Sequence, residues 1–299
     1  MITVFGSINV DLVCRVARLP HHGETVHGSD YLLIPGGKGA NQALAARRAG
    51  AGVRLIGTIG DDDISRVALS ELTPAGVDLS SVARRSGTTG VAIITVDDAG
   101  ENTIALSPGA NAVTHAGQVP AGAFGPRDTL LLQMEVPFQE NLAVARAAGK
   151  AGARVVLSVA PFLALAPERV SDVSILIVNE HEAADFAHSL GLPGGAAEAT
   201  VEALSEKLGR TVIATLGPAG AVAAGRDGVI SVPALKVVPA DTTGAGDTFA
   251  GVLAAYLDEG ADMRDAMLRA AAAGSLACTK PGAQPSFPKR AEIEAALKK

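Results

Sequence analysis

The chain has 299 residues, which is enough for one large α/β domain with a substantial core. Hydrophobic residues make up 48% of it, but aromatic residues only 3%, so Ala, Val and Leu must fill most of that core. The formal net charge of −6 argues against a nucleic-acid partner, because such a partner calls for a basic surface.

The N-terminal sequence and the cysteines favour a cytoplasmic location. The first residues, MITVFGSINVDLV, lack the basic segment that precedes the apolar run of a secretory signal. No long uncharged apolar stretch indicates a membrane span, so we expect no membrane partner. Cys14 and Cys278 lie far apart without metal-binding spacing, which predicts two reduced, buried thiols.

Apolar runs alternate with helical patterns along most of the chain. Strands are predicted at residues 1–6, 53–60, 129–135, 154–159, 174–179 and 211–217. Helices are predicted at residues 40–50, 64–72, 139–152 and 202–209. Near-continuous apolar strands that alternate with helices predict an α/β fold, with a mostly parallel central sheet and helices on both faces.

Two segments interrupt this alternation. Residues 12–35 and 88–106 read as short strands with polar turns, and DDAG at 97–100 separates two strand-like runs as in a hairpin. We expect them to form a small β-sheet lid over one edge of the main sheet, within a single domain that spans residues 1–299. The pattern leaves open whether this sheet closes over a site or forms a dimer contact.

The stretch DTTGAGDTFAGVLAAYL, residues 241–257, combines glycines and two acidic residues before a helical pattern. It fits neither the P-loop motif nor the dinucleotide fingerprint, which argues against a dinucleotide-dependent oxidoreductase. Phe249, Val252, Leu253 and Tyr256 predict one apolar helix face, which puts the glycines at a helix N-terminus that suits an anion. Asp247 is then either a base that takes a proton beside a phosphate or an ordinary helix cap.

Three further stretches place polar residues where strands end or helices begin. GGKGANQA, at 36–43, brings Asn41 to a helix start, where an amide suits a polyhydroxylated ligand. SINVD places Asn9 and Asp11 just after the first strand, where ligands bind in open α/β folds. VNEHE places Asn179 and Glu182 at a strand end, suited to hold Mg²⁺ through water. Ordinary turns and caps explain each stretch alone, but four such stretches in one chain favour a site.

Together these motifs make the sequence similar to the ribokinase-like (PfkB) family of carbohydrate kinases over nearly its whole length. GGKGANQA and DTTGAGDTF match the two signature regions of that family. The resemblance implies that Asp247 is the catalytic base and that Gly244, Ala245 and Gly246 form an anion hole for the transferring phosphoryl group. The implied sugar-contacting positions are Asn9, Asp11, Gly37, Lys38, Asn41, Glu135 and Asp247.

The same resemblance implies the remaining ligands. Asn179, Thr215, Gly217, Gly220 and Gly246 would bind ATP, with Asn179 and Glu182 organising Mg²⁺. A potassium ion that activates the enzyme would lie beside the anion hole, mostly on backbone carbonyls. The implied potassium positions are Asp241, Thr243, Ala277, Lys280, Gly282 and Ser286. The resemblance also implies a homodimer through the β lid.

The expected activity is ATP-dependent phosphorylation of D-ribose at its 5-hydroxyl. Deoxyribose, another sugar or a nucleoside is the alternative acceptor, because Ser158, Val159 and Phe162 depart from the family pattern. Ala271 also departs from it, at a position near the adenine. A sugar sensor without catalysis is the alternative from another class, although it has no need to keep Asp247. The basic residues Arg47, Arg48, Arg84 and Arg85 are expected to be solvated.

Overall fold

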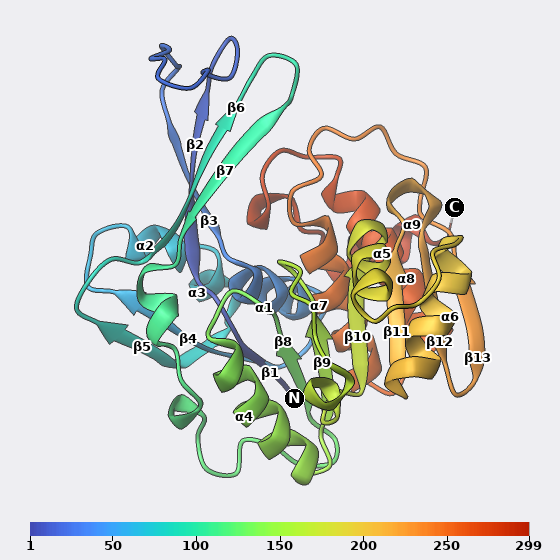
Figure 1. The fold of residues 1–299 in the computed structure, drawn as a ribbon. Helices are drawn as coiled ribbons and strands as arrows, with labels where there is room; N and C mark the ends of the chain where they lie inside the picture. Colours follow the sequence, from blue (N-terminus) through green and yellow to red (C-terminus); the bar gives the residue numbers. More distant parts are fainter. Residues whose placement is uncertain (299) are drawn as a thin grey trace.

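The computed structural model describes residues 1–298, and its main feature is a nine-stranded sheet of order β13-β12-β11-β10-β9-β8-β1-β4-β5. The strands from β5 to β11 run parallel, while β12 and β13 add an antiparallel edge (Figure 1). The strands are β1 (Ile2–Phe5), β4 (Val53–Gly60), β5 (Asp78–Arg85), β8 (Thr129–Leu132), β9 (Arg154–Ser158), β10 (Ile175–Asn179), β11 (Thr211–Thr215), β12 (Ala221–Gly225) and β13 (Gly228–Val232).

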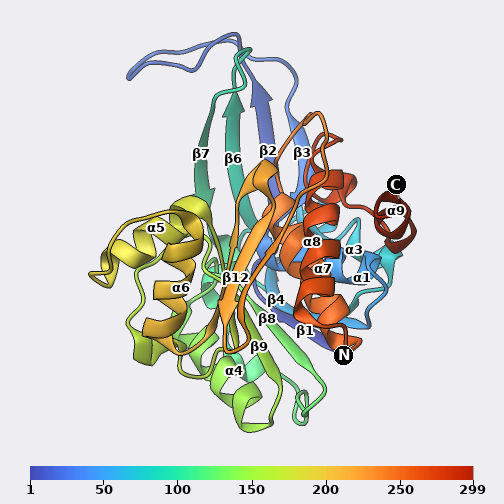
Figure 2. The ribbon, with the colours of Figure 1, turned by 90° about the vertical axis from the view of Figure 1, so that its right-hand side faces the viewer.

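Helices cover both faces of this sheet, as predicted (Figure 2). Alternate strand residues point to opposite faces, so Val4 joins one hydrophobic core while its neighbour Phe5 joins the other. The first core packs under α1 (Lys38–Arg48), α2 (Ser65–Ala68), α3 (Leu72–Ala75), α7 (Ala245–Asp258), α8 (Met263–Ala277) and α9 (Arg290–Ala296). The second packs under α4 (Phe138–Lys150), α5 (Glu180–Ser189) and α6 (Ala197–Leu208).

A second, four-stranded sheet projects away from the main body (Figure 1). Its order is β3-β2-β6-β7, from β2 (Asn9–Arg15), β3 (Leu32–Gly36), β6 (Gly90–Val96) and β7 (Asn102–Ser107). The predicted hairpin is present: β6 and β7 pair antiparallel, and Asp97 accepts hydrogen bonds from two amides of the turn. The pairing of β2 with β6 is parallel, so the sheet is mixed.

Helix α7 is central rather than amphipathic, which corrects the prediction of one apolar face. All residues from Asp247 to Leu257 are buried, because α1 and α8 flank this helix. Gly251 permits the close approach to α1: a Cβ there would lie 2.5 Å from the carbonyl oxygen of Gln42. The helix that carries Asp247 is therefore packed directly on the helix that carries Asn41 and Gln42.

Other local predictions were wrong for identifiable reasons. The helix predicted at 64–72 is broken into α2 and α3, where the Ser70 hydroxyl donates to the carbonyl of Val67 and competes with helical pairing. Arg47 and Arg48 are only partly exposed, and their guanidinium groups donate to backbone carbonyls, so they are not the freely solvated side chains that were predicted. The two thiols are only half-buried.

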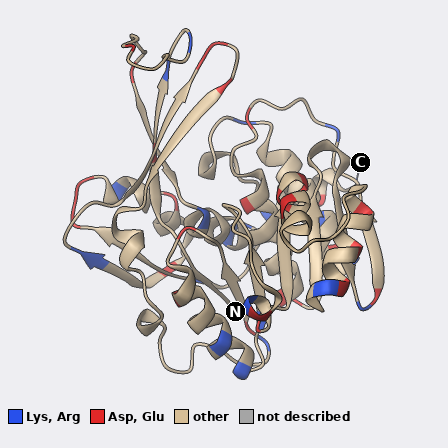
Figure 3. Ribbon diagram, viewed as in Figure 1, with Lys and Arg blue, Asp and Glu red and all other residues tan. Residues whose placement is uncertain are grey.

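Within residues 1–298, no helix has the length and apolar character needed to cross a bilayer. Figure 3 shows Lys and Arg spread among Asp and Glu over the ribbon, rather than gathered on one face.

Candidate active site

The glycine-rich loop enters α7 through a left-handed residue. Gly244 is the N-cap, with φ of 77°, and a Cβ there would lie 2.8 Å from the ring of Phe287. The amides of Gly246 and Asp247 have no protein acceptor within residues 1–298. Free N–H groups at the start of a 14-residue helix are the donor set that an anion requires.

The carboxylate of Asp247 is buried and held at both oxygens by side-chain amides. Asn41 Nδ2 donates to Oδ2 at 2.9 Å, and Gln42 Nε2 donates to Oδ1 at 3.1 Å. These amides are themselves held, since Gln284 donates to Asn41 Oδ1 at 3.1 Å and Gln133 donates to Gln42 Oε1 at 2.8 Å. The carboxylate is thus fixed in orientation, and its side chain does not cap the helix.

Lys38 lies among carboxylates from four different parts of the chain. Asp247 above all, with Glu135, Glu182 and Asp11, raises the pKa of the Lys38 ammonium against the opposing effect of burial. Burial, with repulsion from Glu135 and Asp247, raises the pKa of Asp11 to about 7. The arrangement brings predicted sugar-site residues together around one ammonium group.

Asn9 and Glu135 are held by hydrogen bonds, and the Asp11 carboxylate lies against the backbone at Gly36. Asn9 and Asp11 follow β1, as predicted, and both lie within β2 of the second sheet. The Asn9 side chain accepts from Asn111 Nδ2 at 2.6 Å, and Glu135 Oε2 accepts from the amide of Lys38 at 3.1 Å. At Gly36 a Cβ would lie 2.6 Å from both carboxylate oxygens of Asp11.

Gly37 is the left-handed turn that leads into α1. Its φ is 89°, and a Cβ there would lie 2.6 Å from the amide nitrogen of Asn9. The turn therefore requires glycine both for its conformation and for its close contact with β2.

A cavity of about 410 Å³ lies beside the start of α7. It brings together Thr215, Gly217, Gly220 and Gly246, four positions that the sequence places in a nucleotide site. Ala271 also lines it, so that departure from the family pattern lies in this cavity. Its walls are mostly small and apolar, as suits a planar ring system.

Asn179 and Glu182 form a capping box at the start of α5. Asn179 Oδ1 accepts from the amide of Glu182 at 2.8 Å, and Glu182 Oε2 accepts from the amide of Asn179 at 2.7 Å. Burial raises the pKa of Glu182, and the nearby Lys38 ammonium opposes that rise. Among residues 1–298, no group of three or more His, Cys, Asp or Glu side chains is arranged to hold a metal ion. The capping box uses only Oε2 of Glu182, and its other carboxylate oxygen is of the kind that Mg²⁺ binds directly or through water.

Asp241 organises the other end of the glycine loop. Its Oδ1 accepts from the amide and hydroxyl of Thr243, and its Oδ2 accepts from the amide of Gly282 at 2.8 Å. These hydrogen bonds lower the pKa of Asp241 against the effect of burial. Three of the predicted potassium positions therefore meet here.

The remaining predicted potassium positions lie close by in sequence. Ala277 ends α8, Ser286 is buried and donates to the carbonyl of Ala283, and the Lys280 side chain pairs with Glu292 at 3.6 Å.

Sequence reasoning missed the amides that support the site. Gln42 occurs inside the motif GGKGANQA quoted above, and Gln284 in the stretch GAQPS at 282–286, but no role was assigned to either residue. Gln133 and Asn111 gave no signal, since their partners are more than 90 residues away in sequence. Only the folded chain brings these partners together.

Comparisons with known proteins identify the family of this chain. The model of the pfkB family carbohydrate kinases matches residues 1–290. The chain belongs to the PfkB family of carbohydrate kinases.

Relatives named ribokinase include one from Lactococcus lactis, 35% identical over 99% of this chain and 97% of that protein. A second, from Schizosaccharomyces pombe, is 36% identical over 98% of this chain and 96% of that protein.

Solved structures place the chain in the same family. A ribokinase from Thermotoga maritima has a TM-score of 0.93 at 34% identity and covers 100% of this chain and 99% of its own. An Arabidopsis thaliana ribokinase complexed with ribose and ATP has a TM-score of 0.89 at 30% identity, over 100% of this chain and 98% of its own. The chain is therefore a carbohydrate kinase with the ribokinase-like fold, as the motifs indicated.

Of the residues that depart from the family pattern, Val159 belongs to the core of this kinase and the partly buried Phe162 packs against that core. Val159 is fully buried, and Phe162 packs edge-on against Phe186 at 6.0 Å between ring centroids. Ser158, at the end of β9, is half-buried. The departures at Val159 and Phe162 therefore change packing beneath α5.

Proposed function

We propose that this chain transfers the γ-phosphoryl group of ATP to the 5-hydroxyl of D-ribose. The observation that carries the proposal is the buried carboxylate of Asp247, fixed at both oxygens beside the free amides that begin α7. The ribokinases that match the whole chain, one of them complexed with ribose and ATP, support ribose and ATP as substrates.

Asp247 takes the proton from the attacking hydroxyl, which makes that oxygen nucleophilic as it approaches the phosphorus in line. The backbone around Gly244, Ala245 and Gly246 stabilises the charge that develops on the transferring group. The Lys38 ammonium offsets the negative charge of the carboxylates around it, so that the negatively charged phosphoryl group can approach them. The two free amides at Gly246 and Asp247 support this assignment.

The sugar binds between the second sheet and α1. Asn9, Asp11 and Glu135 accept hydrogen bonds from its hydroxyls, while Gly37 leaves space for the ring. Asn41 has one amide hydrogen left after its bond to Asp247, and it donates this hydrogen to a sugar oxygen.

ATP occupies the cavity lined by Thr215, Gly217 and Gly220, with its phosphates toward Gly246. Asn179 and Glu182 would hold Mg²⁺ through water, and the ion supplies charge neutralisation between the phosphates. Potassium would bind near Asp241, whose lowered pKa keeps it ionised, and would raise activity by fixing the glycine loop.

The second sheet is proposed to act as a lid over the site and as the contact of a homodimer. Its apolar side chains Tyr31, Leu32, Ile93, Ile104 and Leu106 are all well exposed in the single chain. By strand register, Leu32, Ile104 and Leu106 lie on one face of this sheet, while Ile93 lies on the other. The exposed apolar side chains of the first face favour burial against a second copy. The enzyme is proposed to work in the cytoplasm, where free sugar and ATP meet.

The test is an ADP-release assay with Mg-ATP and a panel of pentoses, hexoses and nucleosides, with K⁺ or Na⁺. Fast turnover on ribose that rises with K⁺ supports the whole proposal. If another pentose or a nucleoside reacts and ribose does not, the kinase stands and the ribose assignment is wrong. Sugar binding without any ADP release would favour the alternative that the protein is a sugar sensor without catalysis.

A further inference from the structure

A second large cavity, of about 510 Å³, lies between the end of α1 and the start of α9. It shares no lining residue with the nucleotide cavity. Four basic side chains and one acidic side chain line it: Arg47, Arg48, Lys289, Arg290 and Glu71. So much like charge around one cavity is unfavourable unless something compensates it.

Protein carboxylates compensate only part of this charge. Arg48 pairs with Glu71 at 2.8 Å, and Arg290 pairs with Glu259 at 2.5 Å. Within the described residues 1–298, no carboxylate lies at ion-pair distance from Arg47 or Lys289. Arg47 donates from Nε and Nη1 to the carbonyls of Ala75 and Ala51, which leaves its Nη2 and its positive charge without a carboxylate partner. The exposed Lys289 ammonium adds a second such charge to the cavity wall.

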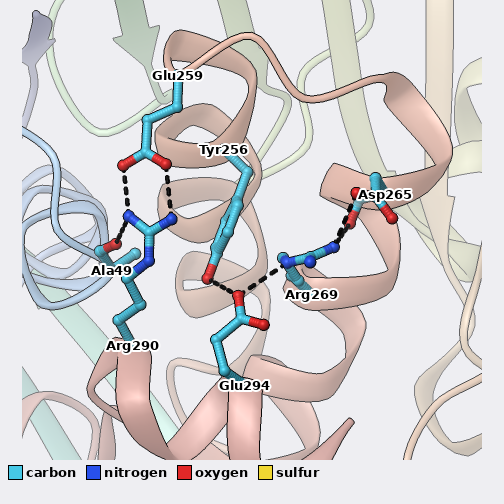
Figure 4. A network of polar contacts seen from close by, with 7 residues as sticks. All are labelled: Ala49, Tyr256, Glu259, Asp265, Arg269, Arg290 and Glu294. Carbon is cyan, nitrogen blue, oxygen red and sulfur yellow. Dashed lines mark hydrogen bonds and ion pairs between the residues drawn. The ribbon is translucent and has the colours of Figure 1, made fainter. Parts of the chain in front are cut away.

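The wall on the α9 side is fixed in place (Figure 4). Arg290 donates to both carboxylate oxygens of Glu259 and lies 4.9 Å from the ring centroid of Tyr256. From the same helix, Glu294 accepts hydrogen bonds from the Tyr256 hydroxyl and from Arg269. These contacts bind α9 to α7 and α8, so the cavity does not depend on a loose segment.

A path of hydrogen bonds leads from this cavity to the catalytic carboxylate. Arg48 Nη1 donates to the carbonyl of Gln284 at 2.6 Å, and Gln284 Nε2 donates to Asn41 Oδ1 at 3.1 Å. Asn41 then donates to Asp247 at 2.9 Å. A bound anion that draws the Arg48 guanidinium group toward the cavity therefore weakens its hydrogen bond to Gln284. Through Asn41, that change alters the hydrogen bond that holds Asp247.

We propose that the cavity between α1 and α9 binds a small anion bearing phosphate groups, and that the bound anion changes the turnover of the kinase through Arg48, Gln284 and Asn41. Guanidinium and ammonium groups recognise phosphate by charge-assisted hydrogen bonds, and the cavity volume admits more than one phosphate. The proposal does not depend on which sugar the kinase phosphorylates.

The experiment uses inorganic pyrophosphate as the probe and calorimetry on the full chain. The active site is first filled with ribose and a non-hydrolysable ATP analogue, so that binding at the anion hole does not contribute. We expect pyrophosphate to bind, and Lys289→Glu to weaken binding about tenfold or more because a charge is reversed. Lys207→Glu, on the exposed face of α6, is the matched control and leaves binding unchanged.

Turnover is the second readout, measured at constant free Mg²⁺. Pyrophosphate is expected to change kcat in the wild type and in Lys207→Glu but not in Lys289→Glu. Loss of binding once the active site is filled, or equal binding by Lys289→Glu, overturns the site. Binding without any change in kcat overturns the connection to Asp247.

Discussion

Gln42 Nε2 donates a hydrogen bond to Asp247 Oδ1 at 3.1 Å, across 205 residues of sequence. Gln42 is completely buried, and its side-chain oxygen Oε1 accepts a hydrogen bond from Gln133 Nε2 at 2.8 Å. The proposed base is thereby held in one orientation before the sugar arrives. Orientation of this kind lowers the barrier without adding any reacting group.

Replacing the base itself should remove most turnover. Asp247→Asn keeps the side-chain volume but accepts no proton, so we expect kcat to fall about 10³-fold. Ribose affinity, measured by calorimetry, should change far less. Near-normal kcat in this variant would show that another group takes the proton.

Removing the support of the base should have a smaller but distinct effect. Gln42→Leu leaves the amide of Gln133 without its acceptor, which should cost about 1–3 kcal/mol of the free energy of unfolding. We expect kcat to fall about tenfold with little change in KM for the sugar, since orientation is lost rather than binding. Gln139→Leu, at an exposed position of α4, is the control. Equal kcat in the two variants would contradict a positioning role for Gln42.

The glycines of the loop should separate stability from activity. Gly244→Ala forces a left-handed alanine against Phe287, so it should lower the free energy of unfolding by about 1–3 kcal/mol. A Cβ at Gly246 meets no protein atom within 4 Å, so Gly246→Ala should leave stability within about 0.5 kcal/mol of the wild type. It should still slow turnover, because the methyl group enters the phosphate space. Thermal melts and kcat values for both variants test this contrast.

Asp11 should make the kinase sensitive to pH. Its pKa is about 7 in the folded chain, well above the ordinary value of 3.8, so the folded state binds more protons than the unfolded state between these values. Stability from this group therefore falls as pH rises from about 4 to 7, and then levels.

Asp11→Asn removes this unfavourable ionisation. We expect it to raise the free energy of unfolding at pH 8 by on the order of 2–4 kcal/mol, with much less gain at pH 4.5. In the wild type, KM for the sugar should rise as pH falls below about 7, because a protonated Asp11 accepts hydrogen bonds less well. Denaturant unfolding of both proteins at pH 8 and pH 4.5 measures the expected gain in the free energy of unfolding. A pH-independent KM would contradict the expected rise in KM.

The sheet was predictable where burial on both faces makes a strand uniformly apolar. β4 and β10 have that character and were found within a residue or so of their ends. β5 was not predicted, because it is an edge strand of sequence DLSSVARR with polar and half-exposed positions. The β12–β13 hairpin was missed as well, since short runs of Ala and Gly resemble helix or turn as much as strand.

The site was predictable where a motif carries both the turn and the chemistry. The loop at Gly244 and the turn at Gly37 were found in this way, because glycine marks the required backbone. Gln133 and Asn111 act only through partners that folding brings to them, so no local pattern marks them. The burial of Arg48 against the carbonyl of Gln284 was unpredictable for the same reason.

The contact of α1 with α7 at Gly251 also has a consequence for synthesis on the ribosome. Asn41 and Gln42 are made early, but the carboxylate that they hold belongs to a helix near the other end of the chain. A nascent chain that stops before Asp247 can already form the early parallel strands, yet it has no centre for phosphoryl transfer. Catalysis therefore begins only after Asp247 and the helices that pack beside it have been made, and its appearance during translation would report the docking of α7 on α1.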